Sequence, residues 1–189
     1  MRNKKLVFAL SLMVVLGAGL GLSRQQLTGQ AKDQVAPHKS AEIPDYVVYR
    51  HLFHHAVALK KKAEEAEKKG EDATQYRTHF QRNAELNDYQ ASILTETAAE
   101  YDQQEKLLEA RAKPLIDAYK AQYPDGKVPH GQKPAPPPAE LRALSEERDA
   151  LVLRMKDRLR TTLGEGEFNR FDSFVKTRIA PNVQQLAPR

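Results

Sequence analysis

The sequence predicts an all-α protein: four to five helices forming a bent antiparallel hairpin or bundle after an N-terminal signal segment. Apolar residues recur at three- and four-residue steps over most of the chain, which is the spacing of amphipathic helices. No apolar-polar alternation is long enough to indicate a strand. Charges of both signs are interleaved, as on a solvated helical surface. Because the chain has no cysteine, disulfides and thiolate sites are excluded and stability must come from packing.

The first segment, residues 1–23, has the layout of a bacterial secretory signal peptide. Positive charge in residues 1–5 precedes an apolar run over 6–22, and Gly21 and Ser23 are small residues where a signal peptidase could cut. The alternative is an uncleaved signal anchor, because about 17 apolar residues lie at the lower edge of a membrane span. We therefore expect a periplasmic or otherwise exported protein, or one anchored to the inner membrane by residues 6–22.

The charge of the mature chain argues against a nucleic-acid partner. Removing Arg2, Lys4 and Lys5 takes three positive charges from the net charge of +5 and leaves +2. Nucleic-acid-binding proteins usually carry a concentrated basic surface, which this interleaved sequence lacks. Contact with a membrane is expected only through the N-terminal segment.

A flexible leader over 24–43 precedes a helical domain over 44–180. The first helix begins at Pro44 and Asp45 and ends at Gly70, a helix-stopping residue. A shorter helix is expected over 72–85, followed by a longer one from Asp88 to about Tyr123. Pro114 lies inside this longer pattern, where proline removes a backbone donor and crowds the carbonyl four residues back, so we expect a kink just before it.

A proline-rich connector over 124–138 interrupts the helices. Asp125 and Gly126 form a turn dipeptide, and four prolines favour extended backbone, which predicts a stiff linker rather than a recognition motif. Helical periodicity resumes from Leu141 to Leu163. A last helix carries Phe168 to Ile179 and is expected to end at Pro181, leaving 181–189 as a tail.

Two segments predict capping motifs at bends between helices. In Leu86-Asn87-Asp-Tyr-Gln90, the Asn87 side chain can accept from the amide of Gln90 while Gln90 reaches back to the amide of Asn87. In the second segment Gly164 has no capping side chain, so only the return bond from Glu167 is expected, with the preceding apolar residue packing on Phe168. The second segment is Leu163-Gly164-Glu-Gly-Glu167.

These segments resemble the Leu-Thr-x-x-Gln motifs of small periplasmic envelope-stress proteins typified by Spy and CpxP. The order of signal peptide, helix, first motif, long helix and second motif is also similar over residues 46–179. Asn87 and Gly164 replace threonine, Glu167 replaces glutamine, and the proline-rich connector is an addition. The resemblance implies a bent helical hairpin, often a homodimer, whose concave face holds unfolded clients or whose relatives bind metal.

Three histidines in the first helix are the candidates for metal binding. His51 and His55 are four residues apart, so they share a helix face and could bind zinc or nickel through neutral imidazoles. A third ligand would have to come from His54 at a strained angle, from His79, or from a carboxylate. The alternative is an amphipathic helix in which His55 borders the core and the other two are solvated.

Aromatic and basic residues are the candidates for binding unfolded chains, because they combine apolar area with solvated charge. The alternative assigns most aromatics to the core, since a thin bundle without tryptophan needs them. Client binding requires that a contiguous apolar patch remain exposed. The candidate residues are Tyr76, Phe80, Arg77, Arg82, Arg154 and Arg158.

The sequence predicts a non-enzymatic binding protein. It has no nucleophile elbow, no phosphate-binding glycine loop and no cysteine nucleophile, so catalysis is not expected. We expect a Spy-like envelope-stress or holdase module whose partners are unfolded or envelope proteins. The alternative is a periplasmic metal-binding or metal-sensing protein, and the third is a structural or interaction domain of an envelope complex. No cofactor is required, although zinc or nickel would suit the metal-binding alternative.

Overall fold

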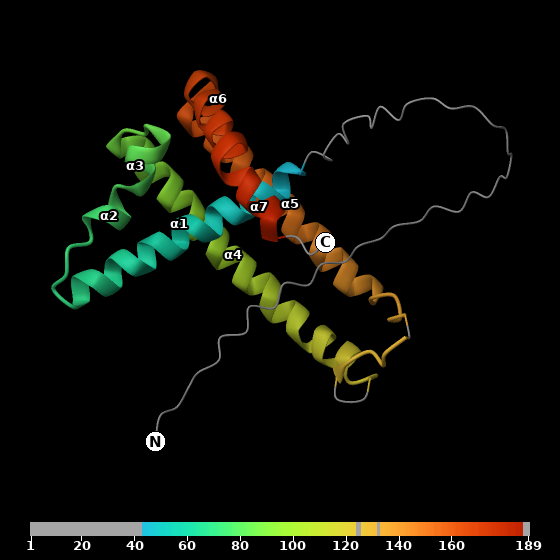
Figure 1. Cartoon of the computed structure of the whole chain (residues 1–189). Helices are drawn as coiled ribbons and strands as arrows, with labels where there is room; N and C mark the ends of the chain where they lie inside the picture. The colour runs from blue at the N-terminus through green and yellow to red at the C-terminus, as the bar shows by residue number, and fades with distance from the viewer. Residues whose placement is uncertain (1–42, 124–125, 132, 187–189) are drawn as a thin grey trace, which may run out of the picture. The chain divides into compact units, whose positions relative to one another are not determined.

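The structure is a computed structural model that describes residues 43–123, 126–131 and 133–186 (Figure 1), and within these ranges it contains helices and no strand. The all-α class is therefore confirmed. The expected signal segment and most of the leader lie outside the described residues. None of the described helices is long and apolar enough to cross a membrane. In chain order the elements are α1 (Asp45–Lys68), α2 (Thr74–Arg77), α3 (His79–Ala84), α4 (Asp88–Lys120), α5 (Ala139–Leu163), α6 (Glu165–Phe174), the π-helical turn η2 (Val175–Ile179) and α7 (Ala180–Leu186).

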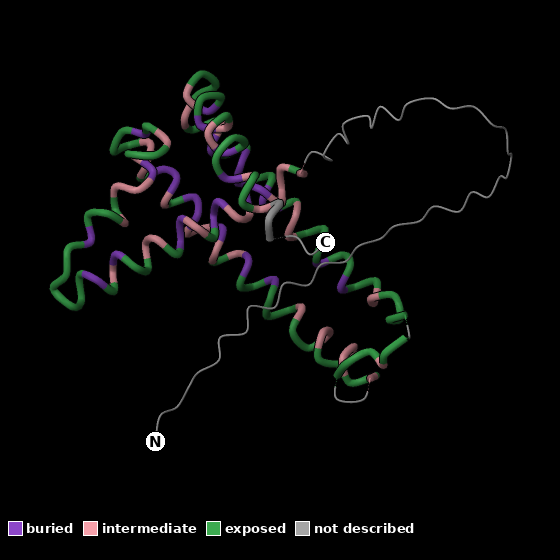
Figure 2. The backbone as a smooth tube through the Cα atoms, in the orientation of Figure 1, coloured by how far each residue is buried: buried purple, intermediate pink, exposed green. Residues whose placement is uncertain are grey.

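An antiparallel helical hairpin underlies the fold, as predicted. Helices α4 and α5 lie side by side and run in opposite directions, and α1 packs against both (Figure 1). The apolar faces of these three helices meet η2 and α6 in a common core (Figure 2). Its largest fully buried side chains are Tyr49, Tyr101, Phe53, Phe168, Phe171, Leu52, Leu94, Leu151, Leu159, Val152 and Val175. Most of the aromatic side chains thus supply the core.

Polar contacts join the start of α1 to α5 and α6. The hydroxyl of Tyr49 donates to Oδ1 of Asp172 over 2.6 Å. Burial raises the pKa of Tyr49, and the hydrogen bond to Asp172 raises it further, so this hydroxyl remains a donor. The buried amine of Lys156 binds Asp45 and lies 5.1 Å from the centre of the Tyr49 ring. A buried ammonium group is stabilised by such a carboxylate and by the aromatic face.

The helix expected over 72–85 is divided in two at Thr78. The backbone of Thr78 leaves the helical region at φ −96° and ψ 12°, which separates α2 from α3. Its hydroxyl donates to the carbonyl of Thr74 over 2.8 Å. The Thr78 N–H also donates to this carbonyl, over 2.9 Å, so the side chain and the backbone share one acceptor. Pro114, where we expected a kink, lies inside α4, which continues to Lys120.

The prediction that Pro181 ends the last helix is wrong. Pro181 is the second residue of α7, which continues to Leu186. Helix runs without a break from α6 through η2 into α7, and the wider π turn just before Pro181 changes the hydrogen-bonding register there. This π turn, closed by a bond from the Ala180 N–H to the Val175 carbonyl, lies between α6 and α7.

Residues 134–138 of the connector are hydrogen-bonded to the end of α4. Ala135 is the one residue there that is not proline. Its N–H donates to the Tyr123 hydroxyl oxygen over 2.7 Å, and its carbonyl accepts from the Tyr119 hydroxyl. Two tyrosines one turn apart therefore hold the proline-rich backbone against α4.

Candidate functional site

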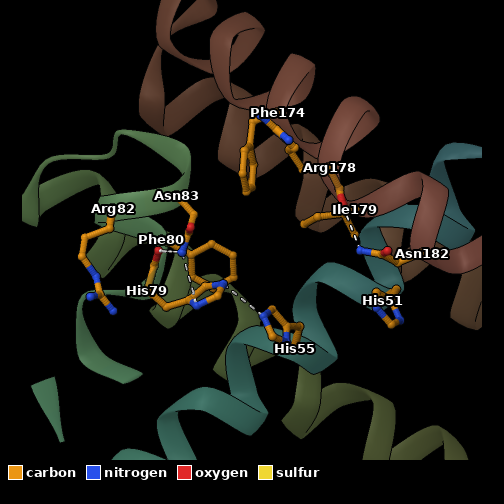
Figure 3. Close-up of a pocket in the computed structure, with 10 residues that line it drawn as sticks. All are labelled: His51, His55, His79, Phe80, Arg82, Asn83, Phe174, Arg178, Ile179 and Asn182. Atoms are coloured by element: carbon orange, nitrogen blue, oxygen red, sulfur yellow. Dashed lines mark hydrogen bonds between the residues drawn. The ribbon is translucent and has the colours of Figure 1, made fainter. Parts of the chain in front are cut away.

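A cavity of about 540 Å³ opens between α1, α3 and the C-terminal helices (Figure 3). Three of its lining residues are histidines: His51 and His55 come from α1, and His79 begins α3. We call this space the histidine cavity. It is lined by His51, His55, His79, Phe80, Arg82, Asn83, Phe174, Arg178, Ile179 and Asn182.

His55 and His79 meet across the cavity from different helices. Their Nε2 atoms are 3.3 Å apart, and the rings are nearly perpendicular with centroids separated by 5.0 Å. The edge-on ring of Phe80 lies 5.8 Å from His55 and 5.1 Å from His79, measured between centroids. The amide nitrogen of Asn83 donates to the backbone carbonyl of His79 over 2.7 Å and lies 3.4 Å from Nδ1 of the His79 ring. Both imidazoles are therefore placed by contacts to neighbouring side chains.

The cavity favours neutral imidazoles. Burial lowers the pKa of His55, and the nearby charges of His79, His51 and Lys62 lower it further. Burial also lowers the pKa of His79, with a smaller contribution from Arg82. The pKa of His51 is lowered by burial and then by His54. At neutral pH each ring therefore has one nitrogen that donates and one that accepts, and the Nε2 of His55 or of His79 donates to the other across the 3.3 Å contact.

The remaining cavity wall combines apolar groups with cationic and amide groups. Phe80 and Ile179 are buried, and Phe174 is half-buried beside them. The Arg82 guanidinium donates to the Gln75 carbonyl over 3.1 Å and points away from the histidines (Figure 3). Arg178 is exposed at the cavity, where its guanidinium group can bind a carboxylate. The cavity can therefore accept an apolar group that has a negative charge nearby.

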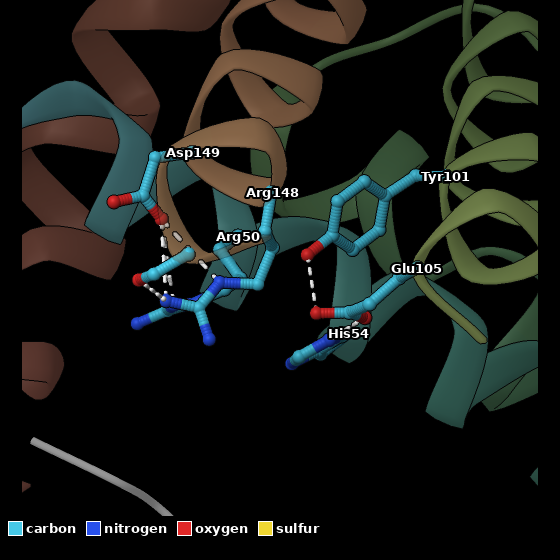
Figure 4. Close-up of polar contacts among 7 residues, drawn as sticks. Arg50, His54, Tyr101, Glu105, Arg148 and Asp149 are labelled. Atoms are coloured by element: carbon cyan, nitrogen blue, oxygen red, sulfur yellow. Dashed lines mark hydrogen bonds and ion pairs between the residues drawn. The ribbon is translucent and has the colours of Figure 1, made fainter. Parts of the chain in front are cut away.

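A separate polar cluster connects α1 with α4 (Figure 4). The carboxylate of Glu105 is buried and accepts from the Tyr101 hydroxyl over 2.6 Å and lies 2.5 Å from Nε2 of His54. Burial would raise the pKa of Glu105, but the hydrogen bonds from His54 and Tyr101 and the charge of Arg148 hold it below its usual value. His54 thus binds Glu105 and is not among the residues that line the histidine cavity.

The first capping motif forms as predicted. The Gln90 N–H donates to Oδ1 of Asn87, and the Asn87 N–H donates to Oε1 of Gln90, each over 2.9 Å. This reciprocal pair begins α4, and Leu86 just before it is buried in the core.

The second capping motif forms differently from the prediction. Gly164, at a φ of 81° that favours glycine, separates α5 from α6. Its N–H donates to the Arg160 carbonyl over 3.0 Å and so still belongs to the last turn of α5. The expected return bond from Glu167 is therefore wrong. Glu167 instead accepts from Nε2 of Gln90 over 2.9 Å and from Arg170. Leu163 packs against the core cluster that contains Phe168.

The structure distributes the candidate client-binding residues over several places. Phe80 and Arg82 line the histidine cavity. Tyr76 packs on a small alanine cluster. Arg77 forms a bidentate ion pair with Glu67, with N–O distances of 2.9 and 2.8 Å. The remaining two candidates are on α5: Arg154 is exposed, and Arg158 pairs with Glu100.

The metal candidates His51 and His55 both line the cavity, but the histidine nitrogen that approaches His55 belongs to His79. Within the described residues, no three histidine, aspartate or glutamate side chains converge so as to hold a metal ion. The site residues predicted from the sequence did not include Arg178 and Asn182. Their four-residue spacing places them along one helical face and was the pattern that could have indicated them.

Comparison with protein-family models, with curated proteins and with solved structures gave no match. The chain's own geometry therefore supplies the argument for function.

Proposed function

We propose that this chain is an exported, non-enzymatic binding protein that holds segments of unfolded or envelope proteins, as a Spy-like holdase does. The observation that carries the proposal is the mixed wall of the histidine cavity. Binding sites that hold proteins are enriched in aromatic residues and arginine. A cavity of about 540 Å³ lies in the range of small-ligand pockets, so it suits a few side chains of an extended segment and not a folded domain.

The charges of the cavity indicate which segments bind best. Arg178 stands beside the apolar side chains of Phe174 and Ile179. A guanidinium group binds a carboxylate through paired hydrogen bonds, whereas it repels a lysine or arginine of the client. We therefore expect preference for apolar segments that contain an acidic residue.

The proposal is tested by light scattering of an unfolding client protein, with the purified protein at equimolar concentration and without ATP. Suppression of aggregation is expected, and Arg178→Glu should weaken it because the substitution reverses the charge at the cavity. Arg142→Glu is the matched control, since Arg142 is an exposed arginine of α5 that does not line the cavity and is not a candidate client-binding residue. Aggregation unchanged by the wild-type protein would refute the holdase function and favour a dedicated envelope partner. Equal suppression by both variants would exclude the cavity as the binding site.

A further inference from the structure

We infer that the hydrogen bond between His55 and His79 is a pH-sensitive switch, which holds α3 against α1 at neutral pH and releases it in acid. The two Nε2 atoms are 3.3 Å apart, and the two residues are 24 positions apart in the chain. The bond therefore joins two separate helices, of which α3 is only six residues long. The effect of this release on client binding rests on the proposed function, whereas the release itself is a property of the chain alone.

The bond tolerates one added proton but not two. Between neutral rings, one Nε2 carries a hydrogen and the other accepts it. A first proton can bind Nδ1 of the donating ring and leave the bond in place. A second proton has to bind the accepting Nε2, which makes both nitrogens donors and both rings cations. At a separation of 3.3 Å the two hydrogens then point at each other, so the rings must move apart.

The surroundings offer no negative charge to stabilise two imidazolium rings. Within the described residues, no aspartate or glutamate lines the histidine cavity. At the start of α4, the carboxylate of Asp88 already accepts from the Gln81 amide over 2.8 Å. Burial lowers the pKa of both histidines of the pair, and nearby positive charges lower it further. The titratable and cationic groups that surround the pair are His51 and Lys62 of α1, Arg82 of α3 and Arg178 of the C-terminal wall.

The direction of the pH effect follows from the proton affinity of the two states. When α3 is released, both rings are solvated and have the ordinary histidine pKa of about 6.5. The pKa is lower while α3 is bound, so the bound state is favoured above about pH 6.5 and loses stability as the pH falls below it. For the second proton alone, the equilibrium constant for release should rise about tenfold between pH 7.5 and 5.5.

Release of α3 uncovers an aromatic side chain for the client. Phe80 is 7% exposed, and its ring meets the rings of His55 and His79 edge-on. Aspartate and glutamate of a client have pKa values near 4, so they remain charged at pH 5.5. An apolar segment with an acidic residue then gains both the Phe80 surface and the new imidazolium charge. Acid therefore strengthens the binding of the same segments that the cavity prefers at neutral pH.

The test is hydrogen exchange of the full chain without any client, measured by mass spectrometry at pH 7.5 and 5.5 and divided by the intrinsic exchange rate at each pH. Opening at the amides of α3 should increase about tenfold at pH 5.5, whereas the amides of α4 keep their protection. His55→Gln and His79→Gln should each reduce this change to less than about twofold, because glutamine can accept a hydrogen bond but does not titrate. His130→Gln is the matched control, because His130 is an exposed histidine of the connector and should leave the change intact.

Three outcomes would overturn the switch. The first is exchange of α3 that does not depend on pH beyond the intrinsic rate. The second is an equal loss of protection in α3 and α4, which would show unfolding of the whole domain. The third is a tenfold change that persists in His79→Gln, which would assign the pH dependence to another group.

A second arm separates the switch from the proposed function. Suppression of client aggregation, relative to the client alone at each pH, should be stronger at pH 5.5 than at pH 7.5, and this difference should shrink in His79→Gln. Release of α3 in acid without suppression at either pH would refute the holdase function and support the switch. Equal suppression at both pH values, with α3 protected at both, would refute the switch and support the holdase function.

Discussion

Replacing Glu105 by alanine should destabilise the protein by about 3 kcal/mol. The carboxylate of Glu105 accepts from Tyr101 over 2.6 Å and contacts His54 over 2.5 Å. Hydrogen bonds to a charged group each contribute about 1.5–3 kcal/mol. The carboxylate is 7% exposed, so the gain from two such bonds is offset in part by the cost of its desolvation. The alanine variant also leaves the fully buried Tyr101 hydroxyl without its partner.

A double-mutant cycle shows how much of this loss belongs to the tyrosine hydroxyl. Tyr101→Phe alone should cost about 1.5 kcal/mol, because it removes one hydrogen bond to the carboxylate. The double variant lacks the Tyr101 hydroxyl, so no buried hydroxyl is left without a partner. The double variant should therefore lose about 3 kcal/mol of stability, which is less than the sum of the two single losses. The coupling between the two residues should thus be about 1.5 kcal/mol.

Urea unfolding followed by helical circular dichroism measures these free energies, since the protein has no tryptophan to report by fluorescence. Glu105→Gln is an informative control: its amide oxygen can still accept from Tyr101, so it should cost less than alanine. Additive losses in the double variant would refute the reasoning, because they would mean that Tyr101 and Glu105 stabilise the fold independently.

Three further predictions concern the polar contacts elsewhere. Stability should decline as the pH falls below about 6.5. The cavity histidines have a lowered pKa in the folded state, so the unfolded chain binds protons at a higher pH than the folded protein does. Melting temperatures at pH 7.5 and 5.5 measure this loss. Gln90→Ala should lower the free energy of unfolding by about 1–2 kcal/mol, as measured with urea, because the Gln90 side chain accepts from the Asn87 N–H and donates to Glu167. The loss should be smaller in a Glu167→Ala background, where the second bond is already absent. Lys156→Met should stay within about 1 kcal/mol of wild type, whereas Asp45→Ala should cost about 3 kcal/mol by leaving the buried ammonium unpaired. Equal losses in that last pair would contradict the assigned burial.

The helical hairpin could be predicted because the apolar periodicity agrees with the positions of the capping, glycine and proline residues along the chain. Asn87 and Gln90 satisfy each other within three residues, so the start of α4 needs no distant contact. Periodicity did not predict the break at Thr78, where the backbone leaves the helical region although the N–H and the hydroxyl of Thr78 both bond the Thr74 carbonyl. Local patterns therefore predict elements well when local bonds decide their ends.

The contacts of the candidate site could not be predicted from spacing, because they join residues far apart in the chain. His51, His54 and His55 are neighbours in sequence, yet His54 binds Glu105 of α4 and His55 meets His79 of α3. Which partner each ring finds depends on how α1 packs. Spacing predicted the pair on one helix face, and tertiary packing supplied the partner from another helix.

A π turn that periodicity did not predict lies in the C-terminal wall of the cavity, just before Pro181. A proline at position 181 crowds the carbonyl four residues back, that of Thr177, in a regular α-helix. The wider turn η2, closed between Ala180 and Val175, provides a different hydrogen-bonding register just before the proline. Val175 and Ile179 stay buried in the core, while Arg178 reaches the cavity. Single π turns often occur at functional sites, so this irregularity agrees with our proposal that the histidine cavity is a binding site.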